Sequence, residues 1–244
     1  MGSPTVSVVI PVYNAAHCLA AALESVLGQE FSDYEIVVID GGSTDGTDRV
    51  AEKFGSKVQF FSSPDRGVYD AMNKGIARCT GTWIYLMGAD DRLADSMVLQ
   101  KVFSGNYDGV DLICGSVHNE ASDHRLVPGV MVSHFGKRLF WKNSVHQQST
   151  FYRRALFSAQ KFDASYRILG DYDFHLYLLH LGASAVHIQT VVAVCGAQGL
   201  SKNFRWNLYA EELRIKRKRL PWWILLPNYP WVVFKYIIKR ITSR

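Results

Sequence analysis

Short apolar segments of strand length alternate with segments of helix length through the first half of this 244-residue chain. This alternation is typical of βαβ units, in which helices join parallel strands and cover both faces of one sheet. The segment 6–11, VSVVIP, is almost entirely apolar, as in a strand that is buried on both faces. We therefore predict an α/β fold with a mostly parallel central sheet. The expected strands are 6–11, 35–40, 58–61, 83–87 and 111–114, and the expected helices are 15–27, 48–54, 68–79 and 96–102.

The pattern loosens after Ser116 through a polar stretch at 118–125. It resumes with an extended segment at 148–152, a helix at 172–181 and a strand at 185–194. We find no internal repeat. These features predict one domain made of two halves, 1–117 and 118–205, followed by an appended tail, 206–244.

Charge is distributed unevenly along the chain. The whole sequence carries 27 Lys and Arg against 22 Asp and Glu, but nine of the basic residues and none of the acids lie in the tail from Leu213 onward. The remaining 18 basic residues face 22 acids, so the body is mildly acidic and the tail is strongly basic. The four cysteines are widely spaced without a C-x-x-C pair, which predicts free, buried thiols. The amino-terminal residues do not resemble a secretory signal, so we expect a cytoplasmic protein.

Acidic residues follow two of the predicted strands. Asp40 ends the segment 35–40 before a glycine-rich loop, and Asp90 and Asp91 follow the segment 83–87. The carboxyl ends of parallel strands meet at one edge of the sheet, where open α/β sheets bind ligands. Carboxylate oxygens at such an edge can hold a divalent metal. The alternative is that Asp90 and Asp91 begin a turn and cap the following helix.

Four motifs in a fixed order carry a family resemblance. They are SVVIPVYN (7–14), VVIDGGSTDGT (37–47), SPDRGVYDAMNKGIARCTGTWIYLMGADD (63–91) and HQQSTFYRR (146–154). Together they resemble the family-two glycosyltransferases of GT-A fold, most closely the bacterial enzymes that build surface polysaccharides of the colanic-acid type. The resemblance covers about residues 7–181. It implies a Rossmann-like GT-A domain, with a nucleotide-sugar-binding half at 1–117 and an acceptor-binding, catalytic half at 118–205.

The resemblance also implies a reaction. It predicts a metal-dependent, inverting hexosyltransferase that moves a sugar from a nucleoside diphosphate to a hydroxyl of a saccharide or lipid-linked saccharide acceptor. Two other functions stay open. A sugar-phosphate nucleotidyltransferase would also place acids at strand ends, and a catalytically silent nucleotide-binding or scaffold protein would tolerate glycines where the family has acids.

The family's donor site can be carried over residue by residue. In the resemblance, Asp40 accepts a hydrogen bond from the nucleotide base, while Gly41 replaces the family's usual second acid. A carboxylate only accepts hydrogen bonds, so Asp40 would suit the N–H edges of uracil, thymine or guanine. Arg66 has the planar guanidinium that matches phosphate geometry. Pro11, Val12 and Tyr13 are expected to wall the base pocket, and Asp65, Arg66, Asp70 and Asn73 are expected to line the donor.

The metal motif of the family corresponds to Gly88-Ala89-Asp90-Asp91, where Gly88 stands in place of its first acid. The resemblance makes Asp91 the ligand of Mn²⁺ or Mg²⁺, with Asp90 on the ribose or sharing the metal. The metal would neutralise the charge that builds on the diphosphate as it leaves. His146 is expected to reach the diphosphate or the metal, since imidazole can ligate and imidazolium can pair with phosphate.

The general base is expected in the segment ILGDYDFHLYL, 168–178, where Gly170 replaces the family's Glu. Asp171 is the predicted base and Asp173 the reserve. Asp171 could instead act only as the cap of the helix 172–181. Gly199 and Ser201 resemble a family loop that closes over the diphosphate.

In the tail, the basic run 214–219 is followed by the segment 220–244, which holds three of the six tryptophans. Pro221, Pro227 and Pro230 interrupt the uncharged stretch 220–234, so we do not expect a membrane-spanning helix. A basic, aromatic helix lying in the membrane interface fits better and predicts peripheral attachment to an anionic surface at the inner face of the cell membrane. Packing on the core or contact with a second copy in an oligomer are the alternatives. Nucleic acid is not an expected partner, because the aliphatic surface would go unused.

Overall fold

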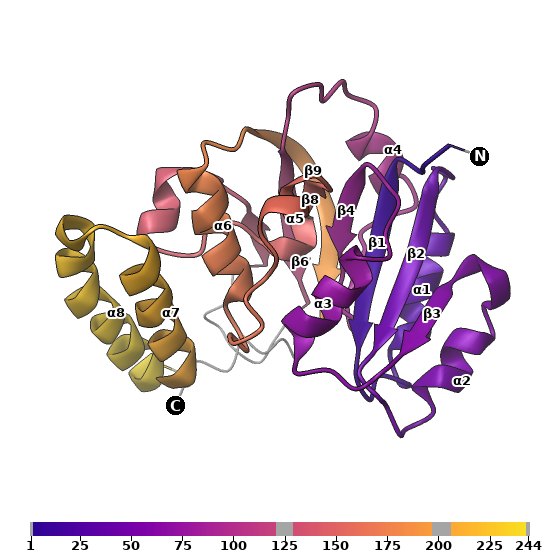
Figure 1. Cartoon of the computed structure of the whole chain (residues 1–244), viewed down its shortest axis with the longest axis horizontal. Helices are drawn as coiled ribbons and strands as arrows, with labels where there is room; N and C mark the ends of the chain where they lie inside the picture. The colour runs from indigo at the N-terminus through magenta and orange to yellow at the C-terminus, as the bar shows by residue number, and fades with distance from the viewer. Residues whose placement is uncertain (1, 121–128, 197–205, 243–244) are drawn as a thin grey trace.

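The computed structural model describes residues 2–120, 129–196 and 206–242, and nine strands of these residues form one sheet. Figure 1 shows this sheet at the centre with helices on both sides and a pair of helices at one end. The strand order is β3-β2-β1-β4-β8-β6-β9-β5, and β7 pairs with β6. The strands are β1 (Val6–Val12), β2 (Tyr34–Asp40), β3 (Gln59–Ser62), β4 (Trp83–Leu86), β5 (Arg92–Leu93), β6 (Leu112–Asn119), β7 (Val130–Val132), β8 (Thr150–Arg153) and β9 (Ala185–Cys195).

The helices follow the predicted order along the chain. Each predicted helix of the domain is present, with ends that shift by up to four residues. The α-helices are α1 (Leu19–Leu27), α2 (Thr47–Glu52), α3 (Val68–Ile76), α4 (Val98–Val102), α5 (Leu156–Ala159), α6 (Gly170–His180), α7 (Trp206–Arg219) and α8 (Trp222–Thr242), and the short 3-10 turns are η1 (Gly55–Lys57), η2 (Lys137–Phe140) and η3 (Gln147–Ser149).

The sheet is parallel in its first part and mixed in its second. Strand β1 runs parallel to both β2 and β4, and β2 runs parallel to β3, which confirms the βαβ prediction for residues 6–86. Strand β8 is antiparallel to β4 and β6, whereas β6 and β9 are parallel. The expectation of a mostly parallel sheet therefore holds only for the first part. A parallel strand needs a long crossover, usually helical, and the segment 133–149 between β7 and β8 contains no α-helix.

Successive side chains of the central strands point to opposite faces of the sheet and pack into two separate hydrophobic cores. Val9, Val37 and Ile84 pack with α3 and α6 on one face, while Val8 and Tyr85 pack with α1 and α4 on the other. This arrangement explains why every residue of β1 is buried. The four cysteines are free, as predicted; three are buried, and Cys18 is half-buried.

Helices α7 and α8 lie side by side at the end of the molecule beyond α6 (Figure 1). Helix α8 is continuous over 21 residues and contains Pro227 and Pro230, so the prediction that prolines break this segment is wrong. Both prolines lie on the exposed side, while Asn228 and Val232 between and after them are fully buried. Packing on the buried side thus offsets the cost of the missing backbone N–H groups. Among the described residues, no helix is long and apolar enough to cross a bilayer.

Candidate active site

The parallel strands end together at the edge of the sheet where the sequence places its candidate donor residues. Val12 pairs with Asp40, and Asp40 pairs with Ser62, so the ends of β1, β2 and β3 are in register. Pro11 and Val12 are buried parts of β1, whereas the Tyr13 side chain that follows is 67% exposed. Only Tyr13 of this trio therefore offers a large surface to a ligand.

The Asp40 side chain points into the glycine-rich loop that follows it. The residue is 2% exposed, and its carboxylate accepts hydrogen bonds from the backbone N–H groups of Gly42 and Ser43 and from the hydroxyls of Ser43 and Ser62. Burial acts to raise the pKa of Asp40, but the hydrogen bonds from Ser43 and Ser62 outweigh it, and the pKa lies below its ordinary value. Asp40 thus stays ionised and fixes the shape of the glycine-rich loop.

The turn before α3 holds the next group of predicted residues. Asp65 Oδ1 accepts the backbone N–H of Gly67 at 2.8 Å, and Gly67 has φ +123°, a conformation that favours glycine. Asp70 accepts the backbone N–H of Arg66 at 3.1 Å and pairs with Lys74 at 3.3 Å. The Arg66 side chain is 81% exposed and reaches Asp70 only at 3.4 Å. Its guanidinium is therefore available to a phosphate group.

The acids after β4 adopt two different environments. Asp91 is 5% exposed, and its two carboxylate oxygens accept the backbone N–H groups of Gly88 and Gly196, each at 3.1 Å. Asp90 is exposed. A Cβ atom at Gly88 would lie 2.6 Å from Asp91 Oδ2, so the Asp91 carboxylate fills the space that a side chain at position 88 would need. Helix α4 begins only at Val98, so Asp91 is not its cap.

Asp90 and Asp91 provide the type of ligand atom that a divalent metal needs. Asp90 and Asp91 supply hard oxygens, and Mg²⁺ beside phosphates is commonly held by one or two carboxylates together with the phosphates themselves. The described residues do not gather three or more His, Cys, Asp or Glu side chains in one metal site. The donor set therefore fits a metal that binds together with a diphosphate better than a metal enclosed by protein ligands alone.

Asp171 lies in the first turn of α6 and is held by two side chains from distant segments. Tyr69 Oη lies 3.3 Å from Asp171 Oδ1, and Asn143 Nδ2 donates to Asp171 Oδ2 at 2.9 Å. Burial raises the pKa of Asp171 to about 6, although these hydrogen bonds act to lower it. Part of the residue remains accessible to solvent. A carboxylate with this pKa is suited to accept a proton near neutral pH.

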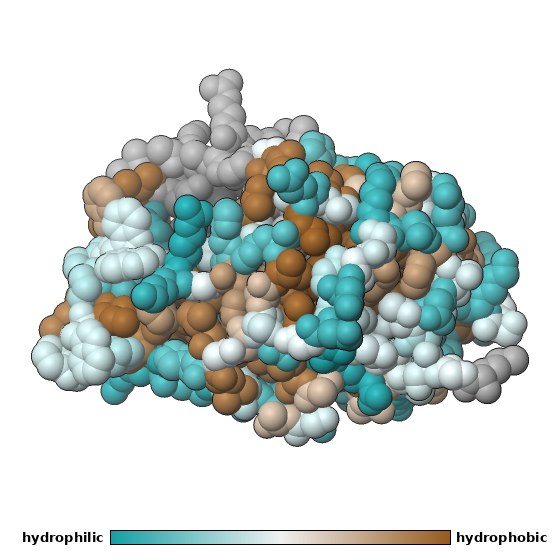
Figure 2. Space-filling model, turned by 90° about the horizontal axis from the view of Figure 1, so that it is seen from above, coloured by the Kyte–Doolittle hydropathy of each residue, from teal (hydrophilic) through white to brown (hydrophobic). Residues whose placement is uncertain are grey.

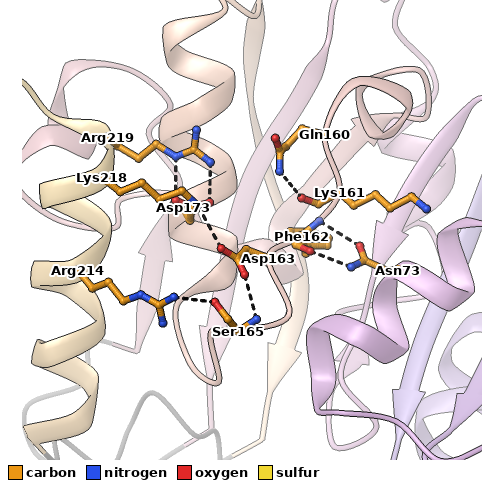
Figure 3. A network of polar contacts seen from close by, with 10 residues as sticks. All are labelled: Asn73, Gln160, Lys161, Phe162, Asp163, Ser165, Asp173, Arg214, Lys218 and Arg219. Carbon is orange, nitrogen blue, oxygen red and sulfur yellow. Dashed lines mark hydrogen bonds and ion pairs between the residues drawn. The ribbon is translucent and has the colours of Figure 1, made fainter.

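Asp173, the reserve base, has a different role. It is 2% exposed and pairs with Arg219 through two hydrogen bonds of 2.8 and 2.7 Å, with Lys218 at 3.3 Å. Figure 3 shows this pairing, together with the contact between Lys218 and Asp163. Asp173 therefore joins α6 to α7 and is not free to act as a base.

The structure narrows the possible roles of two further predicted residues, Asn73 and His146. The Asn73 amide donates to the Phe162 carbonyl at 2.9 Å and accepts the Phe162 N–H at 3.0 Å, so it fastens α3 to the segment before α6 (Figure 3). Burial lowers the pKa of His146 to about 4, so its ring is neutral at pH 7. The neutral ring can ligate a metal but cannot pair with phosphate as a cation. Gly199 and Ser201 lie outside the described residues.

Sequence reasoning missed Tyr69 and Asn143. Tyr69 is part of the recognised motif 63–91 but lies 102 residues before Asp171, and Asn143 lies 28 residues before it. Gly170 is informative in retrospect, because a side chain there would meet the Tyr69 ring at 2.8 Å. The ring thus fills the space that a side chain at position 170 would need. No local pattern marks Asn143.

Comparisons with known proteins agree with this arrangement. The family model Glycosyl transferase family 2 matches residues 7–161. The PGL/p-HBAD biosynthesis glycosyltransferase of Mycobacterium bovis is 37% identical over 183 residues, which cover 72% of this chain and 70% of that protein. The closeness to colanic-acid-type enzymes stays a prediction.

Solved structures resemble the fold. Staphylococcus aureus TarS 1–349 in complex with UDP-GlcNAc superposes with a TM-score of 0.70 at 20% identity, covering 86% of this chain and 65% of that one. The mannosyltransferase PcManGT from Pyrobaculum calidifontis, in complex with GDP-Man and Mn²⁺, gives a TM-score of 0.63 at 18% identity, covering 97% of this chain and 74% of that one. These likenesses confirm the predicted GT-A architecture.

Proposed function

Because the chain belongs to glycosyl transferase family 2, we propose that it moves a sugar from a nucleoside diphosphate to an acceptor hydroxyl, with Asp171 as the base. The observation that best supports this role of Asp171 is its contact with Tyr69. Tyr69 lies four residues after Asp65 in the turn and helix that carry the candidate donor residues. One segment thus connects the donor edge with a carboxylate whose pKa is about 6.

In the proposed reaction, Asp171 takes the proton of the acceptor hydroxyl as its oxygen attacks the anomeric carbon. The new C–O bond forms while the bond between that carbon and the diphosphate oxygen breaks, and the nucleoside diphosphate leaves with the bonding electrons. A single displacement inverts the anomeric centre. At pH 7 most Asp171 carboxyls carry no proton, as a base requires, and the raised pKa makes them stronger proton acceptors than an ordinary aspartate.

Charge on the leaving diphosphate needs compensation. We assign the exposed Arg66 guanidinium to the phosphates, and Asp91 with Asp90 to the Mn²⁺ or Mg²⁺ ion that would accompany them. The ion would supply positive charge beside the leaving group. PcManGT, with Mn²⁺ and GDP-Man, is a precedent among proteins of this fold. His146, neutral in the free protein, remains a candidate contact to the ion.

For the acceptor we propose a saccharide borne by a membrane lipid, and for the protein a peripheral position on the cytoplasmic face of the membrane. The exposed side of α8 supports this, since Trp222, Trp223 and Leu226 are each at least 60% exposed. At that end of the molecule, Figure 2 shows residues of intermediate hydropathy (white) and hydrophobic residues (brown) among hydrophilic ones (teal). The mycobacterial relatives are named for PGL/p-HBAD biosynthesis, which leaves the acceptor of this chain open to test.

The expected electrostatic attraction to the membrane needs revision. Lys216, Lys218, Arg219 and Lys235, four of the nine basic tail residues, form ion pairs within the protein. A cation paired with a buried carboxylate contributes little to attraction by anionic lipid. The proposed attachment therefore depends mainly on the apolar side of α8.

A test of the reaction separates it from its alternatives. The protein is incubated with UDP-, GDP- and dTDP-sugars, or with a nucleoside triphosphate and sugar 1-phosphate, with Mn²⁺ or with a chelator. Transfer predicts nucleoside diphosphate release from a nucleotide sugar, at a low rate by hydrolysis if no acceptor is present. Pyrophosphate release from the second mixture would identify a nucleotidyltransferase, and tight diphosphate binding without turnover would identify a silent binding protein. Asp91→Asn should lower Mn²⁺-dependent diphosphate affinity at least about tenfold.

A further inference from the structure

The carboxylate that the resemblance assigns to the nucleotide base is already occupied. Asp40 is 2% exposed, and both of its oxygens accept hydrogen bonds from the loop 42–43 or from Ser62. A ligand could reach it only if this loop gave up several of those bonds. The position after Asp40 is Gly41, which has no side chain to replace it.

A second carboxylate occupies the space above Gly41. A Cβ atom built on Gly41 would lie 2.4 Å from Asp65 Oδ2 and 3.4 Å from Tyr13 Cδ2. Asp65 Oδ1 is fixed by the Gly67 N–H, while Oδ2 has no hydrogen-bond partner among the described residues. The exposed Tyr13 ring and a free carboxylate oxygen therefore flank the same point at the end of β2.

We propose that Asp65, and not Asp40, reads the nucleotide base: Oδ2 accepts the ring N–H of a uracil or thymine whose face lies on Tyr13. This inference rests on the proposed function, because it requires a nucleotide at this edge of the sheet. An aromatic ring supplies stacking to any base, whereas a carboxylate accepts hydrogen bonds only and so selects bases with a ring N–H. Adenine and cytosine present an unprotonated ring nitrogen at the corresponding position and would be rejected.

The number of Asp65 carboxylate oxygens that are open to a ligand narrows the choice of base further. Guanine offers two adjacent donors, the ring N–H and the amino group, which suit a carboxylate with both oxygens open. Uracil and thymine offer one N–H between two carbonyls. Because Oδ1 is committed to Gly67, the single open oxygen Oδ2 matches the single donor. We therefore expect uridine and thymidine diphosphates to bind more tightly than guanosine diphosphate.

Gly41 provides a rescue test. Calorimetry with UDP, GDP and CDP in the presence of Mn²⁺ would be run on the full chain and on four variants. Asp65→Ala should weaken UDP binding roughly 10- to 100-fold, the usual effect of losing a hydrogen bond to a charged group. Adding Gly41→Asp to Asp65→Ala returns a carboxylate to the same space and should restore most of this affinity. Asp48→Ala, which removes an exposed acid of α2, serves as the control and should leave UDP binding unchanged.

Asp65→Asn guards against a folding defect, because its amide oxygen can still accept the Gly67 N–H. Its amide N–H can donate to the ring nitrogen of cytosine, so the ratio of UDP to CDP affinity should fall by about fivefold or more. Unchanged UDP affinity in Asp65→Ala, or a parent protein that prefers GDP or CDP, would overturn the assignment while leaving a nucleotide-dependent transferase intact. A parent protein that binds none of the three diphosphates would refute the proposed function as well.

Discussion

The buried acids at the donor edge and the buried acid beneath the tail are held in opposite ways. Asp40 and Asp91 are 2% and 5% exposed and are held by backbone N–H groups, in the case of Asp40 with serine hydroxyls as well. Asp173 is 2% exposed and is held by Arg219 and Lys218. Neutral donors stabilise a carboxylate without cancelling its charge, whereas a guanidinium cancels it. The described contacts of Asp40 thus leave its negative charge at the donor edge, whereas the tail uses Arg219 and Lys218 to dock on the domain.

Asp171 tests this comparison most strongly, because the side chains that hold it, Tyr69 and Asn143, are neutral like the donors to Asp40. Asp171→Asn keeps the shape of the side chain but cannot take a proton, so transfer should fall by about 10²- to 10⁴-fold with donor affinity retained. Steady-state kinetics with a nucleotide sugar and calorimetry with its diphosphate would measure both. A rate within a few-fold of the parent would refute the assignment of the base.

The same variant has a consequence for stability. The folded protein keeps the Asp171 proton up to about pH 6, whereas the unfolded chain releases it near the ordinary value of 3.8. This difference contributes stability that is fully present below about pH 4 and is lost as the pH rises through about 6. Asp171→Asn should therefore be more stable than the parent at pH 7, by on the order of 1–3 kcal/mol. A thermal melt at pH 4 and pH 7 would show the gain only at the higher pH.

Replacing the acid beneath the tail should give the opposite result. Asp173→Asn leaves the Arg219 guanidinium, whose side chain is 16% exposed, without its carboxylate. Breaking a buried pair on one side typically costs about 3–5 kcal/mol. Denaturant unfolding should show a loss of this size, while UDP affinity under native conditions stays near that of the parent. Loss of transfer without loss of stability would instead return Asp173 to the catalytic site.

The tail's paired cations and exposed tryptophans predict how a membrane would be bound. If each of Trp222 and Trp223 inserts by about one third, together they contribute about 3 kcal/mol. Trp222→Ala combined with Trp223→Ala should weaken co-sedimentation with anionic vesicles by roughly 100-fold. Replacing the exposed Arg214 and Arg217 by Ala should have a smaller effect. Binding that high salt abolishes would show that charge, and not the apolar side of α8, carries the attachment.

The smallest expected effect concerns Tyr69, whose hydrogen bond lowers the pKa of Asp171. Tyr69→Phe should raise that pKa and move the acidic limb of the activity profile to higher pH, so the rate falls more at pH 6 than at pH 8. We expect a loss within about tenfold at pH 7. Tyr69 Oη also donates to the Ile168 carbonyl at 2.8 Å. Tyr107→Phe is therefore a matched control, because Tyr107 Oη donates to a backbone carbonyl, that of Val102, outside the candidate site. Identical pH–activity profiles for the two variants would show that Tyr69 contributes only packing at this site.

Prediction from the sequence succeeded where the signal was local. The strands and helices of residues 6–86 follow from apolar runs and turn residues, and their parallel pairing follows from the helices between them. The antiparallel return of β8 and the continuity of α8 through two prolines were not predicted. Both depend on packing partners that lie far away in the sequence, and a local pattern carries no information about them.

The sequence by itself determined which residue types stand at the carboxyl ends of the strands, since strand length and turn chemistry fix those positions. It therefore placed Asp40 and Asp91 at the carboxyl ends of strands, and the helical pattern of 172–181 placed Asp171 at the start of a helix. The functional roles of the three acids stay predictions. Only the tertiary structure decided the partners of each acid: Ser43 for Asp40, Gly67 for Asp65, Tyr69 and Asn143 for Asp171, and Arg219 for Asp173. The physical reason is that burial and neighbouring donors or cations, which arise on folding, control whether a carboxylate serves structure, binding or proton transfer.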